Sequence, residues 1–368
     1  MRRPVVVLSL EPWDEVWRRN QYLVDGLLRA DPDLTVLFVE PAADPLHDAL
    51  ARRRPRRSRG LRRVAGYDRL WRLQLTKALP RQVGPFADRL LVSGLRRAMT
   101  RLGWDDPVLW INDPGWAPAV TSLTSPSVYD ITDDWVAADR GDRSAVRTRA
   151  NDEFLMGHAD EVVVCSPELV RRKSGTRSVT LVQNAVDVAR YRRPQPRPPD
   201  LPPAPVALYV GTLHEDRLDV PLTVSTGAAL AQCGGRLVLV GPDALTPSNS
   251  AALRSAAGVV TLGPRPHADV PGYLQHADVL VVPHVVDEFT DSLDPIKLYE
   301  YLAVGRPVVS TPVAGFREAG GTVRVERADA FAASVADMAR ESRPTRTVDV
   351  PTWDDKVRDF AQVLDRLR

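Results

Sequence analysis

The feature that most constrains the fold is a repeated alternation of short, continuous apolar runs with stretches of helical periodicity. Six such runs lie in the first half of the chain, at 4–10, 34–39, 107–112, 127–132, 161–166 and 179–184. Five more lie in the second half, at 205–211, 235–241, 258–263, 278–283 and 306–311. Runs that are apolar throughout predict strands covered on both faces. Their βαβα order predicts an α/β fold with two doubly wound, Rossmann-like parallel sheets.

A proline-rich segment divides the chain near its middle. Residues 194–205 contain seven prolines in twelve positions, and proline favours the extended polyproline II conformation. We therefore expect an N-terminal domain at 1–193, a semi-rigid linker at 194–205 and a C-terminal domain at 206–350. Ligands of open α/β sheets bind at the carboxyl ends of the strands, so we expect two domains facing each other across a cleft. The stretch 353–367 predicts an amphipathic helix that can pack back on the N-terminal domain.

Composition indicates a cytoplasmic protein. No apolar run approaches the ~18–20 residues that a membrane-spanning helix needs. The apolar start is short and an acidic, tryptophan-rich segment follows it, which favours a first strand over a signal peptide. Cys165 and Cys233 are too few for a disulfide framework and are typical of a reducing compartment.

The formal net charge of +2 hides a strongly basic segment. Residues 51–103 carry sixteen Lys or Arg residues and two acidic residues, a net charge of +14. The dense run at 51–63 predicts a loop, and 86–102 predicts an amphipathic helix. Three interpretations stay open: a solvated surface, peripheral contact with the anionic inner face of a membrane, or an anionic acceptor. Nucleic acid fits poorly, because no aromatic-interleaved basic fold accompanies this charge.

The segment 288–311 is the most informative part of the second half. Asp294 and Pro295 predict a helix start with Asp294 as N-cap. A helix N-terminus aimed at a cleft is an anion site, and Lys297 in its first turn makes sense beside an anion such as a diphosphate. Glu300, one turn later, can accept hydrogen bonds from a ribose diol. The alternative is an ordinary surface salt bridge between Lys297 and Glu300.

Other strand ends of the second half add candidate phosphate and base contacts. Gly211 and Thr212 follow a strand, and glycine lets backbone approach a ligand closely. His214 and Arg217 lie in the next loop, where an arginine can clamp a phosphate with two hydrogen bonds. Arg265 lies in a turn that can meet a nucleobase edge. The histidines show no i, i+4 pairing with carboxylates, so we expect no metal site.

The first half offers candidate acceptor and catalytic residues. The loop after the first strand lacks a glycine fingerprint, which argues against a dinucleotide cofactor. It carries Trp13 and Arg19, which suit a sugar or other organic acceptor, although a Trp can equally pack the helix onto the sheet. Further strand ends are followed by polar and aromatic residues: Asp113, Trp116, Asp133 and Asp134. Clustered carboxylates at strand ends suit proton transfer, but Asp also caps turns.

Four segments of the second half, taken in order, resemble a known family. These are YVGTLHEDRLD, LVLVGP, TLGPRPHADVPGYLQHADVLVVP and DSLDPIKLYEYLAVGRPVVSTPVAGFRE. They resemble the nucleotide-binding half of GT-B glycosyltransferases, in particular the large retaining family four. Members carry two glutamates eight positions apart, which contact the donor sugar and the ribose. Glu300 matches the second, whereas Ser292 stands at the first, as in a teichuronic-acid-type subset.

The resemblance implies a glycosyltransferase that moves a sugar from a nucleoside-diphosphate sugar to an acceptor hydroxyl or amine. It implies retention of configuration and no required cofactor, with UDP as the favoured carrier and GDP or dTDP as alternatives. The donor residues would be Gly211, Thr212, His214, Arg217, Arg265, Thr290, Ser292, Asp294, Lys297 and Glu300. The acceptor residues would be Trp13, Arg19 and Trp116, with Asp113, Asp133 and Asp134 as catalytic candidates. Alternatives are a non-hydrolysing sugar-nucleotide epimerase and a catalytically inactive nucleotide-sugar-binding partner protein.

Overall fold

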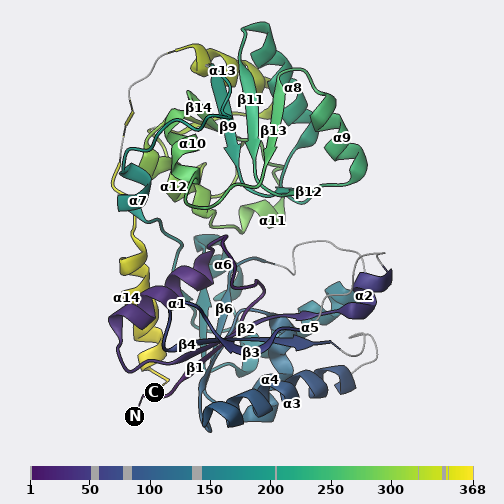
Figure 1. Ribbon diagram of the computed structural model, residues 1–368, viewed down its shortest axis with the longest axis vertical. Coiled ribbons are helices and arrows are strands. Elements are labelled where there is room, and N and C mark those ends of the chain that lie inside the picture. The colour runs from purple at the N-terminus through teal and green to yellow at the C-terminus, as the bar shows by residue number, and fades with distance from the viewer. Residues whose placement is uncertain are drawn as a thin grey trace. The chain divides into compact units, whose positions relative to one another are not determined.

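In a computed structural model, the chain divides into two α/β units (Figure 1). The structure describes residues 2–50, 58–77, 85–134, 143–203, 205–321, 323–341, 345–346 and 348–367. The first unit comprises 1–183 and 354–368, and the second comprises 184–353. Each unit is built around its own sheet and its own buried apolar clusters.

The sheet of the first unit has the order β3-β4-β2-β1-β5-β6-β7-β8. Its strands are β1 (Val5–Leu8), β2 (Val36–Ala43), β3 (Gly60–Arg63), β4 (Leu70–Thr76), β5 (Val108–Ile111), β6 (Ser127–Ile131), β7 (Glu161–Val164) and β8 (Thr180–Leu181). The strand pairs are parallel except for β3, which is antiparallel to β4. The strand order reverses between β1 and β5, which makes this a doubly wound sheet.

Helices pack against both faces of this sheet. They are α1 (Arg19–Ala30), α2 (Pro45–Leu50), α3 (Pro85–Leu102), α4 (Ala117–Leu123), α5 (Arg143–His158), α6 (Pro167–Lys173) and α14 (Trp353–Asp365). Residues of α3, α4 and α5 share one core with Leu37 and Val39 of β2. On the other face, the centroid of the Phe360 ring in α14 lies 4.3 Å from that of Trp110 in β5. The C-terminal helix therefore belongs to the first unit.

The sheet of the second unit is entirely parallel, with the order β13-β11-β9-β14-β15-β16. Its strands are β9 (Val206–Val210), β11 (Arg236–Val240), β13 (Val259–Gly263), β14 (Val279–Val282), β15 (Val308–Ser310) and β16 (Val323–Val325). The short strands β10 (Leu213–His214) and β12 (Asp243–Ala244) pair separately. The strand order reverses between β9 and β14, so a ligand site is expected beyond the carboxyl ends of these two strands.

Helices also flank the second sheet (Figure 1). They are α7 (Val188–Arg192), α8 (Val220–Gln232), α9 (Pro247–Ser255), α10 (Val270–His276), α11 (Glu288–Asp291), α12 (Ile296–Val304) and α13 (Ala328–Arg340). One core joins α10 and α12 to the sheet, and another joins α8 and α13 to it. The predicted α/β class with two doubly wound sheets is confirmed.

The proline-rich segment is part of the second unit and does not act as a free linker. The backbone N–H of Gln195 donates to the side chain of Gln275, and Leu201 is buried in the core of this unit. Asp200 accepts a hydrogen bond from the Tyr273 hydroxyl at 2.6 Å. The boundary between the units lies at 183/184, earlier than the expected 193/194, because these side chains anchor the segment.

The basic segment contains a hairpin that the charge pattern did not predict. Residues 51–57 lie outside the described residues, but 60–63 form β3, so the expectation of a loop throughout 51–63 is wrong there. Leu61 packs against the core, and the Arg63 guanidinium lies 5.3 Å from the centroid of the Trp71 ring. The apolar residue and the ring contact therefore hold these charged residues on the sheet as an edge strand.

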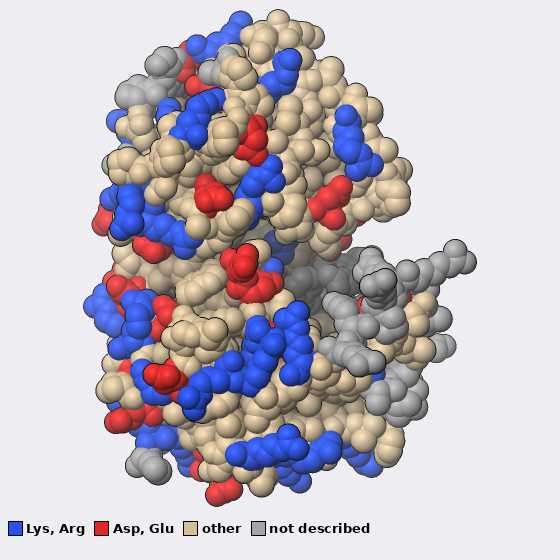
Figure 2. Space-filling model, in the orientation of Figure 1, with Lys and Arg blue, Asp and Glu red and all other residues tan. Residues whose placement is uncertain are grey.

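Charge is unevenly distributed over the surface. On the face shown in Figure 2, Lys and Arg side chains gather over the first unit and stand more singly over the second. In the part of the chain that the structure describes, no helix is both long enough and apolar enough to span a bilayer.

Candidate functional site

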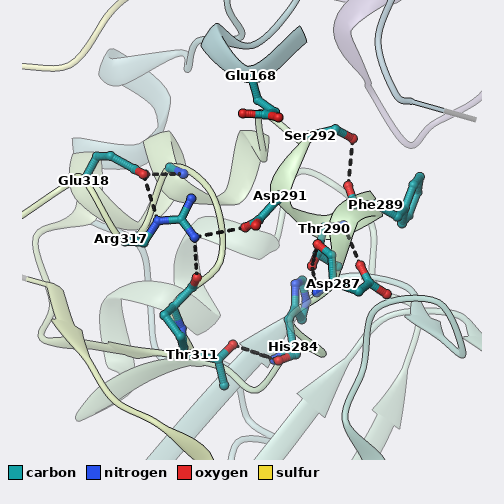
Figure 3. Close-up of polar contacts among 12 residues, drawn as sticks. Glu168, His284, Asp287, Phe289, Thr290, Asp291, Ser292, Thr311, Arg317 and Glu318 are labelled. Atoms are coloured by element: carbon teal, nitrogen blue, oxygen red, sulfur yellow. Dashed lines mark hydrogen bonds and ion pairs between the residues drawn. The ribbon is translucent and has the colours of Figure 1, made fainter. Parts of the chain in front are cut away.

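The candidate site lies at the point where the strand order of the second sheet reverses. β9 ends at Val210 and is followed by Gly211, and β14 ends at Val282 and is followed by Pro283 and His284. The loop after β14 leads through α11 to the first turn of α12, as Figure 3 shows in part. Segments distant in the sequence therefore meet at one edge of the sheet.

Two glycines allow the loops at this edge to approach each other. Gly211 has φ +149°, and a Cβ there would lie 2.8 Å from the Lys297 Nζ atom. Gly241, which follows β11, has φ +148°, and a Cβ there would collide with the Gly211 carbonyl oxygen. Both positions favour glycine because of the backbone conformation, and Gly241 does so also because a Cβ would meet backbone atoms. The result is room for the Lys297 ammonium beside the end of β9.

Lys297 reaches back from the first turn of α12 to two residues at the strand ends. Its Nζ atom donates to the Tyr209 hydroxyl at 2.9 Å and lies 3.4 Å from Nε2 of His284. It also lies 4.0 Å from the centroid of the Tyr209 ring, a cation–π contact. The Tyr209 hydroxyl in turn lies 3.1 Å from Nε2 of His284. The three side chains therefore form one cluster at the reversal point.

The charge of this cluster depends on Lys297, and the cluster contains no carboxylate. Burial, followed by the nearby Arg217, lowers the pKa of Lys297 to about 7, and Glu300 offsets this in part. Burial also lowers the pKa of His284 well below its usual value, with Lys297 and Arg217 adding to the effect. Within the described residues, no carboxylate lies at ion-pair distance from Lys297. The alternative of a surface salt bridge between Lys297 and Glu300 is therefore not realised.

Glu300 lies one turn after Lys297, and its carboxylate accepts a hydrogen bond from Tyr191 of α7. The hydroxyl of Tyr191, a buried residue of α7, donates to its Oε1 atom. Burial raises the pKa of Glu300, whereas Tyr191 and Lys297 lower it. The hydrogen bond from Tyr191 uses Oε1 and not Oε2 of the carboxylate.

Asp294 has a structural role in place of the predicted N-cap. Helix α12 begins at Ile296 with Pro295 in the N-cap position, and no side chain caps it. The Asp294 carboxylate accepts from the backbone N–H of Asn184 at 2.5 Å and from the Tyr299 hydroxyl at 2.6 Å. Its buried position ties the start of the second unit to α12, so the N-cap prediction is wrong.

The loop after β9 carries the remaining predicted phosphate residues. The Arg217 guanidinium lies 5.5 Å from the centroid of the Phe289 ring, and the Arg217 carbonyl accepts from the N–H of Val285 at 2.8 Å. Nδ1 of His214 accepts from the N–H of Asp216 at 3.2 Å. Thr212 is exposed in the same loop. The structure thus brings Arg217 and Lys297 to the same strand ends.

The short helix α11 is held by polar contacts (Figure 3). Two of the residues that make these contacts were predicted to bind the nucleotide-sugar donor. Asp287 and Thr290 form a reciprocal capping box, with the Thr290 N–H donating to Asp287 at 2.8 Å. The hydroxyl of Ser292, which is fully buried, donates to the Phe289 carbonyl at 2.7 Å. Asp291, the last residue of α11, forms an ion pair of 3.0 Å with Arg317 that fixes this end of the helix. Thr290 and Ser292 therefore shape the loop.

Arg265 makes its contacts within the second unit. Its Nη2 atom lies 2.6 Å from the Asp200 carboxylate, and its Nη1 atom donates to the Leu262 carbonyl at 2.6 Å. The Tyr273 hydroxyl joins this cluster at 3.0 Å from Arg265 Nε. These contacts pin residues 194–205 to the domain, a structural role that differs from the expected contact with a nucleobase.

The predicted acceptor residues of the first unit are mostly buried. Arg19 forms a buried ion pair with Asp130 at 3.1 Å, and Asp130 also accepts from the indole N–H of Trp110. Trp13 packs with its ring centroid 5.2 Å from that of Phe38, and Trp116 lies in the core. This burial favours a role for Arg19, Trp13 and Trp116 in holding α1 and the loops onto the sheet over direct contact with an acceptor.

The predicted catalytic carboxylates follow β5 and β6. Asp113 caps the 3₁₀ turn Pro114–Trp116 by accepting from the Gly115 N–H at 2.7 Å. The buried Asp134 forms an ion pair with Arg172 at 3.0 Å. Asp133 lies half-buried next to it. This arrangement favours capping and packing for Asp113 and Asp134.

Sequence reasoning missed three residues of the second-unit site: Tyr209, His284 and Tyr191. A positional signal existed for the first two, because Tyr209 precedes Gly211 by two residues and His284 follows the end of β14 by two. Tyr191 lies in a short helix far from the site in the sequence, and no local pattern indicates its contact with Glu300.

A comparison with protein families finds a match within the second unit. Residues 204–341 match the family model described as Glycosyl transferases group 1. The chain is 24% identical over 218 residues to TuaH of Bacillus subtilis (strain 168), which is named as a putative teichuronic acid biosynthesis glycosyltransferase. That alignment covers 55% of this chain and 55% of TuaH, so it spans about half the length of the relative.

Solved structures of similar fold cover the whole chain. Sucrose-phosphate synthase from Thermosynechococcus elongatus has a TM-score of 0.68 at 19% identity and covers 100% of this chain and 99% of its own. A trehalose-6-phosphate protein from E. coli, bound with UDP-2-fluoro glucose, has a TM-score of 0.65 at 12% identity. The match covers 99% of this chain and 95% of the E. coli chain. The predicted GT-B fold and the resemblance to glycosyltransferases are confirmed.

Proposed function

We propose that this GT-B protein, whose second unit matches the Glycosyl transferases group 1 family, is a glycosyltransferase that uses a nucleoside-diphosphate sugar as donor. The observation that carries the proposal is the partly buried Lys297 ammonium at the reversal point of the sheet. It is held by Tyr209 and His284, and no carboxylate among the described residues lies at ion-pair distance from it. A diphosphate supplies the anionic oxygens that such a position lacks.

Each residue of the site then has a role in binding the donor. Lys297 and Arg217 neutralise the charge that develops on the leaving diphosphate, while Gly211 allows its close approach. Glu300, oriented by Tyr191, accepts hydrogen bonds from the ribose diol. Catalysis comes mainly from positioning and from electrostatic stabilisation of the leaving group.

The identity of the donor and the stereochemistry belong to this proposal. UDP is favoured over GDP and dTDP, because one structure of the same fold binds a UDP-sugar. Retention of configuration and independence from metal follow from the family resemblance. The sugar is transferred to a hydroxyl or amine of an acceptor, a small natural product or a cell-envelope glycan or lipid.

The first unit is assigned to the acceptor. Asp133 is the catalytic candidate there, because it is half-buried and follows the carboxyl end of β6, the edge at which open α/β sheets bind ligands. The basic segment 51–103 would bring the protein to the anionic inner face of a membrane, within the cytoplasm. Residues 51–57 and 78–84 of this segment lie outside the described residues.

Calorimetric titration with UDP, GDP and dTDP tests the proposal. We expect one of them to bind, and Lys297→Met and Glu300→Ala to weaken that binding by at least about tenfold. Binding of none of the three, or equal binding by both variants and the native protein, would overturn it. Incubation of the donor sugar nucleotide alone then separates a transferase from a non-hydrolysing epimerase, which needs no acceptor.

One observation favours a second candidate, a nucleotide-sugar-binding protein without activity. Ser292 occupies the position of the first family glutamate, and its hydroxyl donates inward to the Phe289 carbonyl. A donor-sugar contact through a carboxylate is therefore absent at this residue. Tight donor binding without sugar transfer across a broad acceptor panel would favour this candidate.

A further inference from the structure

The β3–β4 hairpin places two arginines directly opposite each other. Arg62 and Arg72 are Cα partners in the antiparallel register, next to the pair Leu61 and Leu73. The leucines face the core, so the arginines lie on the other face of the hairpin. Like charges directly opposite in a strand pair are destabilising. Their presence therefore calls for a compensating interaction.

The hydrogen bonds of these guanidiniums are incomplete. Nε and Nη2 of Arg62 and Nε of Arg72 are buried, and none has a hydrogen-bond partner within the part of the chain that is described. Buried polar atoms in native proteins are nearly always paired, and a guanidinium offers five donors. Three unpaired donors on two facing arginines indicate that acceptors are missing at this place.

The nearby carboxylate of Glu40 does not accept hydrogen bonds from these three nitrogen atoms. Glu40 is buried and lies 3.5 Å from Nη1 of Arg72, but it also accepts the N–H of Trp13 at 3.1 Å. Burial lowers the pKa of Arg72; Glu40 opposes this effect, and Arg62 and Arg59 add to it. Glu40 is thus the one carboxylate that offsets the charge of Arg72, while the charges of Arg62 and Arg59 act in the opposite sense.

The position of the cluster suits a ligand. Arg72 pairs with Phe38 in the first half of β2, but its side chain reaches the loop that follows the carboxyl end of β1, where Nη1 donates to the Trp13 carbonyl at 3.0 Å. Ligands of open α/β sheets bind at this edge. The Arg72 side chain is 21% exposed, so part of this side chain is accessible from solvent.

We propose that Arg62 and Arg72 form a site for an anionic group, a phosphate or carboxylate, carried by the acceptor. Arginine forks bind such groups through paired, charge-assisted hydrogen bonds, which would supply the missing acceptors and offset the repulsion between the two side chains. That the bound molecule is the acceptor rests on the proposed function. The anion site itself rests only on the hairpin.

Titration with inorganic phosphate tests the site. The protein is first saturated with UDP to occupy the donor position, and phosphate binding is then measured by calorimetry. We expect Arg62→Gln and Arg72→Gln to weaken phosphate binding at least about tenfold. Arg97→Gln, which removes the same charge from an exposed position on α3, serves as matched control and should bind as the native protein does. Parallel titration with acetate separates a preference for phosphate from one for carboxylate.

Thermal unfolding without ligand provides a second measurement. Arg62→Gln removes one of two opposed charges and leaves the contact between Arg72 and Glu40 intact, so this variant should unfold at or above the melting temperature of the native protein. Arg72→Gln also removes the cation beside the buried Glu40, so it should unfold at a lower temperature than Arg62→Gln. Absence of phosphate and acetate binding, equal binding by all variants, or loss of the fold in both glutamine variants would overturn the site. If UDP fails to bind, the proposed function fails, and the phosphate titration is repeated on Lys297→Met to judge the hairpin separately.

Discussion

The Lys297 ammonium lies 2.9 Å from the Tyr209 hydroxyl and 4.0 Å from the centroid of the same ring. This relationship joins the first turn of α12 to the last residues of β9. Because Tyr209 contributes a dipole and a ring rather than a charge, the ammonium is oriented but has no counter-ion at ion-pair distance among the described residues. The site is therefore prepared for an anion.

Diphosphate binding should be coupled to uptake of a proton by Lys297. The pKa of this residue is lowered to about 7, so the free site is increasingly neutral above that pH, whereas an anion stabilises the charged form. We expect UDP affinity to fall by up to about tenfold per pH unit between about pH 7.5 and 9, where the terminal phosphate, with a pKa of about 6, is already ionised. Calorimetry in buffers of different ionisation enthalpy measures this uptake.

Lys297→Arg is the matched control for that experiment. Arginine stays protonated throughout this range, so its UDP binding should take up no proton and vary little with pH. The neighbouring His284, whose pKa is held well below its usual value, does not titrate there either. Equal pH dependence in the native protein and the arginine variant would contradict the assignment to Lys297.

Tyr191→Phe should weaken donor binding without unfolding the protein. The substitution removes the hydroxyl that orients Glu300 and lowers its pKa, and a hydrogen bond to a charged group contributes about 1.5–3 kcal/mol. We expect the donor Kd to rise about tenfold or more. Tyr273→Phe, which loses a similar bond to the Asp200 carboxylate away from the reversal point, should leave donor affinity unchanged. Equal effects of the two would count against a positioning role.

Gly211→Ala should displace the Lys297 ammonium. A Cβ at this residue would lie 2.8 Å from Nζ, and the φ of +149° disfavours alanine. We expect a loss of about 1–3 kcal/mol in unfolding free energy together with weaker UDP binding. Gly234→Ala, with φ +76° and open space around its Cβ, separates backbone strain from the clash. Loss of UDP affinity in both variants alike would exclude displacement of Lys297 as the cause.

The fold could be predicted from the sequence better than the roles of individual side chains. Continuous apolar runs identify buried parallel strands because their period and length are local properties. Arg19, Asp294 and Arg265 each have a partner more than sixty residues away in the chain, so no local pattern reveals these contacts. The sequence does indicate an anion site at Lys297, because a cation in the first turn of a helix is unfavourable for the helix dipole unless an anion lies nearby.

Breaking the buried ion pair between Arg19 and Asp130 should destabilise the first unit strongly. The two side chains are 5% and 0% exposed, and Asp130 also holds the Trp110 indole at 3.1 Å. Arg19→Met leaves the buried carboxylate without its cation, so we expect a loss of about 3–5 kcal/mol in unfolding free energy by chemical denaturation. The double substitution Arg19→Met with Asp130→Leu removes both charges and should recover part of that loss. If Arg19 instead bound the acceptor from an exposed position, the single variant would keep its stability and lose only acceptor affinity.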